Sequence, residues 1–555
     1  MTRQRTLIFW GAGATAALGI RTTAQQTETL RKLVGAGRDA QPLKERIASA
    51  LGQNGAEPWH HALCDLITIL GDTDEAYRSI HIVKDDQMQA MSRNWQPGAS
   101  SGELTRRIIE LRLIYDWPAL KSVFRICPGS DTDSFKLNDL FNVLDMHIPL
   151  KFGFRAPAGR EREWESAQAG HQFFDARRLI GAKNALLLIL MTLFHIDYQV
   201  CLSTKRTVLE QYYSFAVELA RRAQRQGIEA AATGTPLDSP EFYQSDVGFV
   251  SLNYDPIGLW IQFIAHRELN KTSTAPHVGS PAIPLHLYHD FGHLIPARGV
   301  ERRESDWPWY PLNEAAAQRL NEQKYPSGYR VKLTKFLFPH GCLCWRECPD
   351  CGKLSAFHGD TWDLFSGGLF PPPPLQAFDR TPCNDRIAGE ERKEREKGII
   401  DARACLHCGT LTYAHHTQTV MQSSFKSPPP SFIDEIQRDL RAAAMQTDHI
   451  IFMGYSLPPD DVTYRAFFSA RRQHESKPER APCCSIVGWD ERHPDWYGPA
   501  VLDGWNLPKY PVIQAARDIF GRQNVRFYGG GAPNVFLDEA GRATQDRLKQ
   551  LLEWS

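Results

Sequence analysis

The sequence is poor in three features that would define its class at once. Only 12 of its 555 residues are cysteine, too few for a disulfide-stapled scaffold. Neither charge predominates, since 64 basic residues balance 64 acidic ones, which argues against a strongly basic nucleic-acid-binding surface. No apolar run reaches the length needed to span a bilayer, and the nearest, 185–194, is typical of a buried helix. We therefore expect no direct nucleic-acid partner and no membrane span.

What the chain does have is the composition of an ordinary globular protein, with 42% hydrophobic and 11% aromatic residues. Its length predicts roughly two to four structural units. Four of the cysteines occur in CxxC pairs, a pattern typical of metal ligands rather than disulfides. These features predict a soluble protein of the reducing cytoplasm.

The first distinctive stretch is a glycine turn near the N-terminus. Thr6–Trp10 predicts a buried strand, and Gly11-Ala12-Gly13 follows it directly, before small residues with helix propensity. Such a turn lets backbone N–H groups approach a phosphate. A chance GxG is an open alternative, because Ala16 stands where the dinucleotide fingerprint has its third glycine. Arg3 and Arg5 before this apolar run also resemble the start of a secretory signal. The glycines in a turn arrangement, and cysteines spaced like metal ligands, argue against a signal.

The rest of the chain alternates between helix and strand patterns. The spacing of apolar residues predicts mostly helix over 41–243, with one long helix or a pair at 183–226. Strands are predicted at 247–252, 333–338, His449–Met453, Cys483–Val487 and Val525–Tyr528. Helices are predicted between several of them, including 432–445 and 464–474. Apolar strands alternating with helices predict an α/β fold with a doubly wound parallel sheet, whose ligand lies at the carboxyl ends of the strands.

Polar or glycine motifs stand at three further strand ends. Asn253 and Asp255 follow the strand at 247–252 and could bind ribose hydroxyls or a water, although a plain Asx turn is the alternative. His340 follows the next strand and could be exposed at a cleft as a base, or be an ordinary loop residue. Gly454 and Ser456 form a turn that could take a ribose or phosphate, or simply end a strand. Together they predict one shared site.

Two clusters could hold a metal. Cys348, Cys351, Cys405 and Cys408 form two CxxC turns, which predict a closed, structural zinc site with an insertion of 53 residues between the pairs. The alternative is unpaired reduced cysteines. Cys342 and Cys344 lie nearby and could replace a ligand, although we interpret them as bystanders.

The second cluster consists of three histidines, His286, His289 and His293. Their spacing could suit a metal on a helix. Asp290 and Gly292 favour a turn instead, so we do not predict a metal site there.

In this order the motifs resemble those of the sirtuin family, most closely the sirtuin-like proteins of bacterial anti-phage systems. The pieces are Gly11-Ala12-Gly13 with Thr15, Asn253-Tyr254-Asp255, His340-Gly341, the pairs Cys348/Cys351 and Cys405/Cys408, and Gly454-Tyr455-Ser456-Leu457. The Asn-Tyr-Asp and Gly-Tyr-Ser-Leu-Pro forms are typical of the prokaryotic branch, which segment 135–145 also resembles. The resemblance covers residues 1–30 and about 246–545.

The resemblance implies a Rossmann-like fold that binds NAD in a cleft beside a smaller zinc and helical module. The residues it assigns to the cofactor are Gly11, Ala12, Gly13 and Thr15 at the pyrophosphate, and Gly454 and Ser456 at the adenosine ribose. Asn253 and Asp255 would hold the nicotinamide ribose and position the attacking group. His340 would be the general base, and no catalytic metal would be needed.

Two departures from the family favour one activity over another. Sirtuin deacylases carry Gly-Ile-Pro-Asp-Phe-Arg after the loop, whereas Gly19-Ile20 is followed here by Arg21-Thr22-Thr23-Ala24. The long stretch between Asp255 and His340 could also cap an acyl-peptide channel. Our first hypothesis is therefore an NAD⁺ hydrolase that acts as an abortive-infection effector and releases nicotinamide and ADP-ribose. A protein-lysine deacylase or ADP-ribosyltransferase is the second, and a non-enzymatic nucleotide-sensing subunit is the third.

These interpretations divide the chain into five segments. They are the first part of the Rossmann-like NAD domain (1–40), a helical insertion for oligomerisation or partner docking (41–245), the continued NAD domain (246–341), a zinc-binding module of ribbon type (342–415) and the C-terminal part of the NAD domain (416–555). The chain has no recognisable sensor or NTPase motif. We therefore expect a homo-oligomer, a partner sensor or NTPase subunit, or both.

Overall fold

The fold was analysed in a computed structural model of the whole chain. It describes residues 5–34, 115–129, 134–156, 172–272, 285–290, 330–347, 354–356, 364–365, 419–420, 423, 429–459, 461–474 and 482–554.

An eight-stranded, mostly parallel sheet forms the centre of the described structure. Its strands are β1 (Thr6–Trp10), β4 (Val247–Ser251), β5 (Leu285–Asp290), β6 (Arg330–Leu337), β9 (His449–Met453), β10 (Cys483–Val487), β11 (Trp496–Tyr497) and β12 (Val525–Tyr528). They lie in the order β11-β12-β10-β9-β1-β4-β6-β5, and only the edge strand β11 runs antiparallel to its neighbour. The predicted α/β class and parallel sheet are confirmed.

Strand β1 lies in the middle of this sheet and is covered on both faces. Its five residues are all buried. Phe9 contacts Tyr464 and Phe468 of α18 (Val462–His474), while Trp10 contacts Tyr212 of α12 (Arg206–Ala232). Successive side chains of a strand point to opposite faces, so α12 and α18 cover opposite faces of the sheet. This two-sided burial explains why β1 is an unbroken apolar run.

Further helices complete the two outer layers. They are α13 (Pro240–Tyr243), α14 (Ile257–Thr272), α17 (Ser431–Met445), α19 (Pro499–Leu502), α20 (Pro511–Phe520) and α21 (Gln545–Leu552). Helix α14 packs on α12 and β5, and α20 packs on α18, β10 and β12. The expected helices at 432–445 and 464–474 correspond to α17 and α18.

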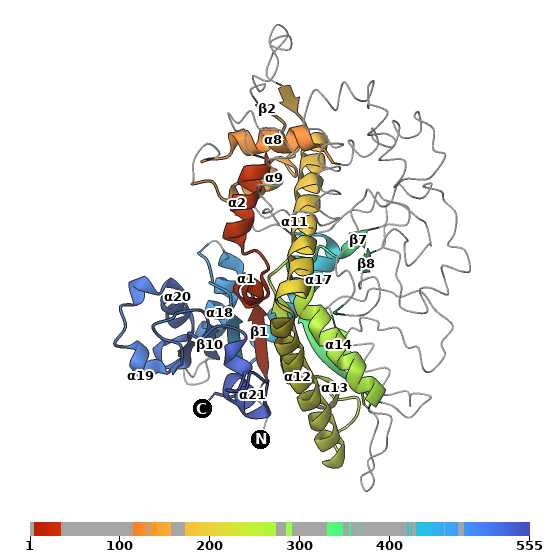
Figure 1. Ribbon diagram of the computed structural model, residues 1–555, viewed down its shortest axis with the longest axis vertical. Coiled ribbons are helices and arrows are strands. Elements are labelled where there is room, and N and C mark those ends of the chain that lie inside the picture. The colour runs from red at the N-terminus through yellow and green to blue at the C-terminus, as the bar shows by residue number, and fades with distance from the viewer. Residues whose placement is uncertain are drawn as a thin grey trace, which may run out of the picture.

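A group of helices extends from one end of the sheet. It comprises α2 (Thr23–Val34), α8 (Trp117–Ile126), α9 (Leu137–His147) and α11 (Ala176–Thr204), with the small hairpin β2 (Phe154–Ala156) and β3 (Gln172–Phe174). Figure 1 shows α2, α8 and α9 beside the N-terminal half of α11, with α12 continuing from its other end toward the sheet. The predicted helix or pair at 183–226 is therefore a pair, α11 and α12, divided at Lys205.

Helix α11 is longer than its apolar run suggested. At 29 residues it is long and apolar enough to cross a membrane, so the statement that no segment reaches that length is wrong. The apolar run continues into flanking residues that also face the protein, and 83% of the most apolar window is buried inside the structure. Its environment is that of a core helix.

Two strands of the central sheet, β5 and β11, were not predicted from the sequence. The expected turn around Asp290 is wrong, because His286, His289 and Asp290 all belong to β5. Strand β5 pairs along its whole length with β6. The hydrogen bonds of this pairing stabilise an extended backbone even though the polar side chains of β5 favour a turn in isolation. The two-residue strand β11 is too short to give a periodic signal.

The C-terminal helix α21 is tied to the sheet by a buried arginine. Arg526 of β12 donates from Nη2 to the carbonyls of Gln550 and Leu551, at 2.9 and 3.0 Å, and to a third carbonyl in the same segment. Its Nε donates to Ser485 Oγ at 2.7 Å. The same hydroxyl lies 2.7 Å from His449 Nε2, whose other ring nitrogen reaches the Leu552 carbonyl at 2.9 Å. Three neighbouring strands thus share one polar network.

We expect Arg526→Met to lower the free energy of unfolding by about 2–3 kcal/mol, because it leaves buried carbonyls and a hydroxyl without their donor. A urea titration followed by circular dichroism measures the change. The control Arg522→Met, four residues earlier on the exposed surface, should stay within about 0.5 kcal/mol of the parent. Equal losses in both variants would contradict a stabilising role for the network.

Candidate functional site

Three strand ends meet at one edge of the sheet, because β1 pairs in register with both of its neighbours. Trp10, the last residue of β1, lies opposite Ser251 of β4 and Met453 of β9. The segments that follow these strands therefore leave the sheet at the same level. The chain also passes from β1 to β4 on one side and returns to β9 on the other. Such a reversal, at the carboxyl ends of parallel strands, is where α/β proteins bind ligands.

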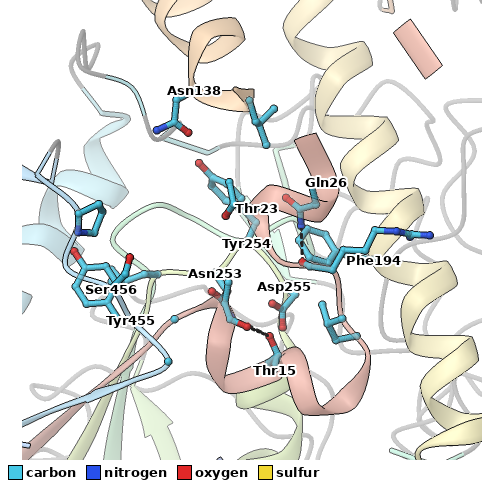
Figure 2. Close-up of a pocket in the computed structure, with 18 of the residues that line it drawn as sticks. Thr15, Thr23, Gln26, Asn138, Phe194, Asn253, Tyr254, Asp255, Tyr455 and Ser456 are labelled. Carbon is cyan, nitrogen blue, oxygen red and sulfur yellow. Dashed lines mark hydrogen bonds between the residues drawn. The ribbon is translucent and has the colours of Figure 1, made fainter. Parts of the chain in front are cut away.

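A cleft of about 250 Å³ lies at this point. Among the residues that line it are Gly11, Ala12, Thr15, Asn253, Asp255, Gly454 and Ser456. These are seven of the nine predicted catalytic and cofactor-binding residues, and only Gly13 and His340 are missing from the lining. Figure 2 shows Asn253 and Asp255 side by side above Thr15, with Ser456 across the cleft from Phe194.

The floor of the cleft is an interlock of two glycine turns. Gly11 N–H donates to the Met453 carbonyl at 3.0 Å, and Gly13 N–H donates to the Gly454 carbonyl at 2.9 Å. Gly454 has a φ of +63°, and a β-carbon there would lie 2.0 Å from the backbone nitrogen of Ala14. The backbones therefore approach more closely than any side chain allows, which explains the glycines in both turns.

This packing changes the predicted role of Gly13. Its N–H group is already bonded to Gly454, so Gly13 lies behind the lining and does not face a ligand. The helix that follows is also shorter than expected: α1 (Ala12–Thr15) is a single turn, continued by the 3₁₀ turn η1 (Ala16–Leu18) and ended by Gly19 at a φ of +83°. Any phosphate would thus meet the edge formed by Gly11, Ala12 and Thr15 rather than the end of a long helix.

Asn253 and Asp255 are held by the first turn and by the start of α14. Asn253 Nδ2 lies 3.4 Å from Thr15 Oγ1, an interaction that joins the β4 loop to the β1 loop. Asp255 Oδ1 accepts from the Ile257 N–H at 3.1 Å, the arrangement of a helix N-terminus. The predicted Asx turn is therefore present, and the same side chain also lines the cleft. Burial raises the pKa of the Asp255 carboxyl from its usual 3.8 to about 6.

His340 does not lie at the cleft surface, so the expected exposure of this residue is wrong. It is only 1% exposed, because the loop after β6 folds behind the cleft-lining residues Leu252 and Tyr254. Its Nε2 lies 3.0 Å from the Tyr464 hydroxyl, and its Nδ1 lies 3.4 Å from the Leu252 carbonyl. Its role as a base remains a prediction, and in this conformation the Asp255 carboxyl is the titratable group nearer to a ligand.

The turn after β9 is shaped by two residues with positive φ, Gly454 at +63° and Leu457 at +49°. Between them the Tyr455 ring stacks on Phe9, and its hydroxyl donates to Asp461 Oδ2 at 2.6 Å. Ser456 is left exposed in the cleft. A left-handed leucine is uncommon, and such strained positions cluster at functional sites.

The sequence analysis missed one whole wall of the cleft. It is lined by Leu137, Asn138 and Phe141 of α9, Phe194 of α11, Ile20 and Arg21 before α2, and Thr23 and Gln26 at the start of α2. The only available signal was the family resemblance of segment 135–145, which was not connected to a site. Nothing in the sequence identifies Phe194 as a cleft residue, because it is one apolar residue in an apolar helix.

The predicted zinc ligands Cys348, Cys351, Cys405 and Cys408, and also His293, lie outside the described residues. Cys342 and Cys344 are buried, with their sulfurs 3.2 Å apart, and Cys342 Sγ approaches the Tyr254 carbonyl at 3.4 Å. Within the part of the chain that the structure describes, no group of three His, Cys, Asp or Glu side chains is arranged to hold a metal.

Comparison with protein-family models and with curated proteins found no match. The geometry of the cleft and the ordered motifs are therefore the basis for assigning a function.

Proposed function

We propose that this chain is an NAD⁺ hydrolase that acts as an effector of anti-phage defence. The observation that carries the proposal is the register of β1 with β4 and β9. It delivers Gly11, Asn253 and Gly454 from distant parts of the chain into one cleft. These are the motifs whose order resembles the sirtuin family, and the resemblance supplies the ligand, NAD. The defence role rests on the resemblance to the anti-phage branch.

The finer architecture belongs to the same proposal. Segments 1–40, 246–341 and 416–555 would form one Rossmann-like NAD domain, and the strand order with its reversal at β1 supports this. Residues 342–415 would form a zinc-stabilised module, and 41–245 the helical insertion. We also propose a cytoplasmic protein that works as a homo-oligomer or with a sensor or NTPase subunit. The six cysteines that the structure describes are free thiols, which suits a reducing compartment.

The proposed reaction breaks the bond between the nicotinamide nitrogen and C1′ of its ribose. The bonding electron pair goes to the pyridine ring, which loses its positive charge, and the ribose gains oxocarbenium character. A water oxygen then attacks C1′ and its proton passes to a base. Asn253 would hold the ribose or the water, Thr15 would remain at the pyrophosphate, and Asp255 or His340 would take the proton. The products are nicotinamide, ADP-ribose and a proton.

The helical wall supports hydrolysis over transfer to a peptide. Leu137, Phe141 and Phe194 close one side of the cleft with apolar side chains, where an extended acceptor would need an open channel. A protein-lysine deacylase or ADP-ribosyltransferase remains the alternative function of the same cleft. A non-enzymatic nucleotide-sensing subunit is the second alternative, and the pairing of an amide with a carboxyl of pKa about 6 in the cleft argues against it.

The test incubates the purified protein with NAD, alone, with an acetylated peptide, and with candidate partner or phage proteins. We expect free ADP-ribose without peptide, measured by chromatography. Asn253→Ala should lower the rate by about 100-fold or more, because an amide aimed at the reacting ribose is lost. The control Asn524→Ala changes an asparagine whose side-chain amide donates to the Phe520 carbonyl and does not line the cleft, and it should leave the rate unchanged.

Deacetylated peptide together with an O-acetylated ADP-ribose product would replace hydrolysis by the deacylase alternative. NAD loss that persists in Asn253→Ala would show that the site is assigned wrongly. NAD binding without turnover under all these conditions would favour the nucleotide-sensing subunit.

A further inference from the structure

One ion pair joins the helical insertion to the cleft. Arg21, which follows the first glycine turn, lines the cleft, and Asp197 lies on α11 one turn beyond the cleft-lining Phe194. The Asp197 carboxylate receives two hydrogen bonds from the same residue. The Arg21 backbone N–H donates to Oδ2 at 2.9 Å, and Arg21 Nη1 donates to Oδ1 at 2.5 Å. The two side chains are 17% and 6% exposed, so the pair is largely withdrawn from water.

Because Asp197 accepts a hydrogen bond from the Arg21 backbone N–H, it fixes the position of the main chain at Arg21. Arg21 lies in segment 20–26, which supplies Ile20, Arg21, Thr23 and Gln26 to the cleft wall. Gln26 Nε2 in turn donates to the Arg21 carbonyl at 3.2 Å, so both peptide groups of Arg21 are held. An apolar contact would bury this junction at lower cost, because a buried ion pair rarely adds net stability. We therefore infer that the Asp197 carboxylate has a role besides packing α11 against the first turn.

We propose that Asp197 is a positioning residue of the NAD-cleaving site, which holds the cleft wall at 20–26 through Arg21. The helical insertion is then a working part of the site rather than only a docking surface. This inference rests on the proposed function.

The electrostatics agree with the geometry. Burial raises the pKa of Asp197 to about 6, while the neighbouring Arg21 charge and hydrogen bonds oppose the rise. Asp255 is raised to a pKa of about 6, chiefly by burial and slightly by the negative charge of Asp197. The Cys342 thiol, from the loop after β6, also interacts electrostatically with Asp255. Removing the charge of Asp197 should therefore lower the pKa of Asp255.

Two variants of the full chain test the proposal. Asp197→Asn keeps the shape but removes the charge. The matched control is Asp116→Asn, which weakens another carboxylate–arginine pair on α11, where Arg178 Nε donates to Asp116 Oδ2 at 2.7 Å. The Asp116 side chain also accepts from the Ala119 N–H at the start of α8, and asparagine can keep this bond.

We expect Asp197→Asn to speed amide hydrogen exchange in peptides covering 20–26, to lower kcat/KM for NAD about tenfold, and to move the acid limb of the kcat–pH profile downward. Asp116→Asn should change none of the three. Unchanged exchange at 20–26, or a pH profile that stays in place, would overturn the proposal. If the parent protein does not cleave NAD at all, the proposed function fails, whereas the exchange experiment still decides whether Asp197 positions the wall.

Discussion

Replacing Gly454 with alanine is expected to separate the two glycine turns and to weaken the proposed NAD binding by more than tenfold. The new β-carbon would lie 2.0 Å from Ala14 N and 2.3 Å from the Gly13 carbonyl carbon, both of them backbone atoms that cannot rotate away. The residue would also hold a φ of +63°, which costs an alanine about 1 kcal/mol. The first turn must therefore move, and it carries the cleft residues Gly11, Ala12 and Thr15 with it.

The backbone strain and the clash can be separated by a control at Gly234. This glycine has a φ of +75°, and a β-carbon at this position would meet nothing within 4 Å, so Gly234→Ala adds strain without a clash. We expect Gly454→Ala to lower the free energy of unfolding by about 2–4 kcal/mol and Gly234→Ala by only about 1 kcal/mol. Urea unfolding and calorimetry with NAD measure the two effects. Equal losses in both variants, with unchanged NAD binding, would contradict the interlock as the floor of the site.

Replacing Asp255 with asparagine is expected to stabilise the protein while lowering the proposed NAD turnover. The Asp255 side chain is 3% exposed, and burial raises its pKa from 3.8 to about 6, so the folded state binds this proton more tightly than the unfolded chain does. Near pH 7 the buried charge therefore opposes folding by up to about 3 kcal/mol. Asparagine removes the charge and can still accept from Ile257, and we expect a gain of about 1–3 kcal/mol.

The sign of this effect can be checked by pH. The penalty of Asp255 is complete above its folded pKa of about 6 and disappears as the pH falls toward the ordinary value of 3.8. The advantage of Asp255→Asn in urea unfolding should therefore shrink between about pH 7 and pH 4. Asp490 is the opposite case, because a hydrogen bond from His493 lowers its pKa to about 2. Asp490→Asn should be destabilising near pH 7, and a gain there would contradict the electrostatic argument.

Arg21 shows how a departure from a family motif can be misread from sequence. It stands where deacylases continue their own motif, and the sequence shows only that it differs. In the structure it bonds to Asp197, 176 positions away, and it lines the cleft. No spacing rule connects two residues so far apart, since their contact depends on how α11 lies against the first turn.

Strands were predicted correctly where the strand is buried on both faces, because its sequence is then a short, mainly apolar run. The limits of β1, β9, β10 and β12 agree with the sequence pattern residue for residue, because a strand covered on both faces is short, mainly apolar and ended by turn residues. Prediction failed for β5, whose histidines and Asp290 are polar. The hydrogen bonds from β6 that stabilise this strand come from residues 45 positions later in the chain.

The sequence by itself determined the parallel sheet and the residues that its central strands would present at their carboxyl ends. These properties are local, since they follow from apolar runs and from the glycine or polar residues directly after them. Only the tertiary structure decided that Gly13 is used in packing, that His340 is buried beneath the cleft, and that α9 and α11 close its side. Those outcomes depend on how distant backbones and side chains exclude one another and share hydrogen bonds, which no local pattern records.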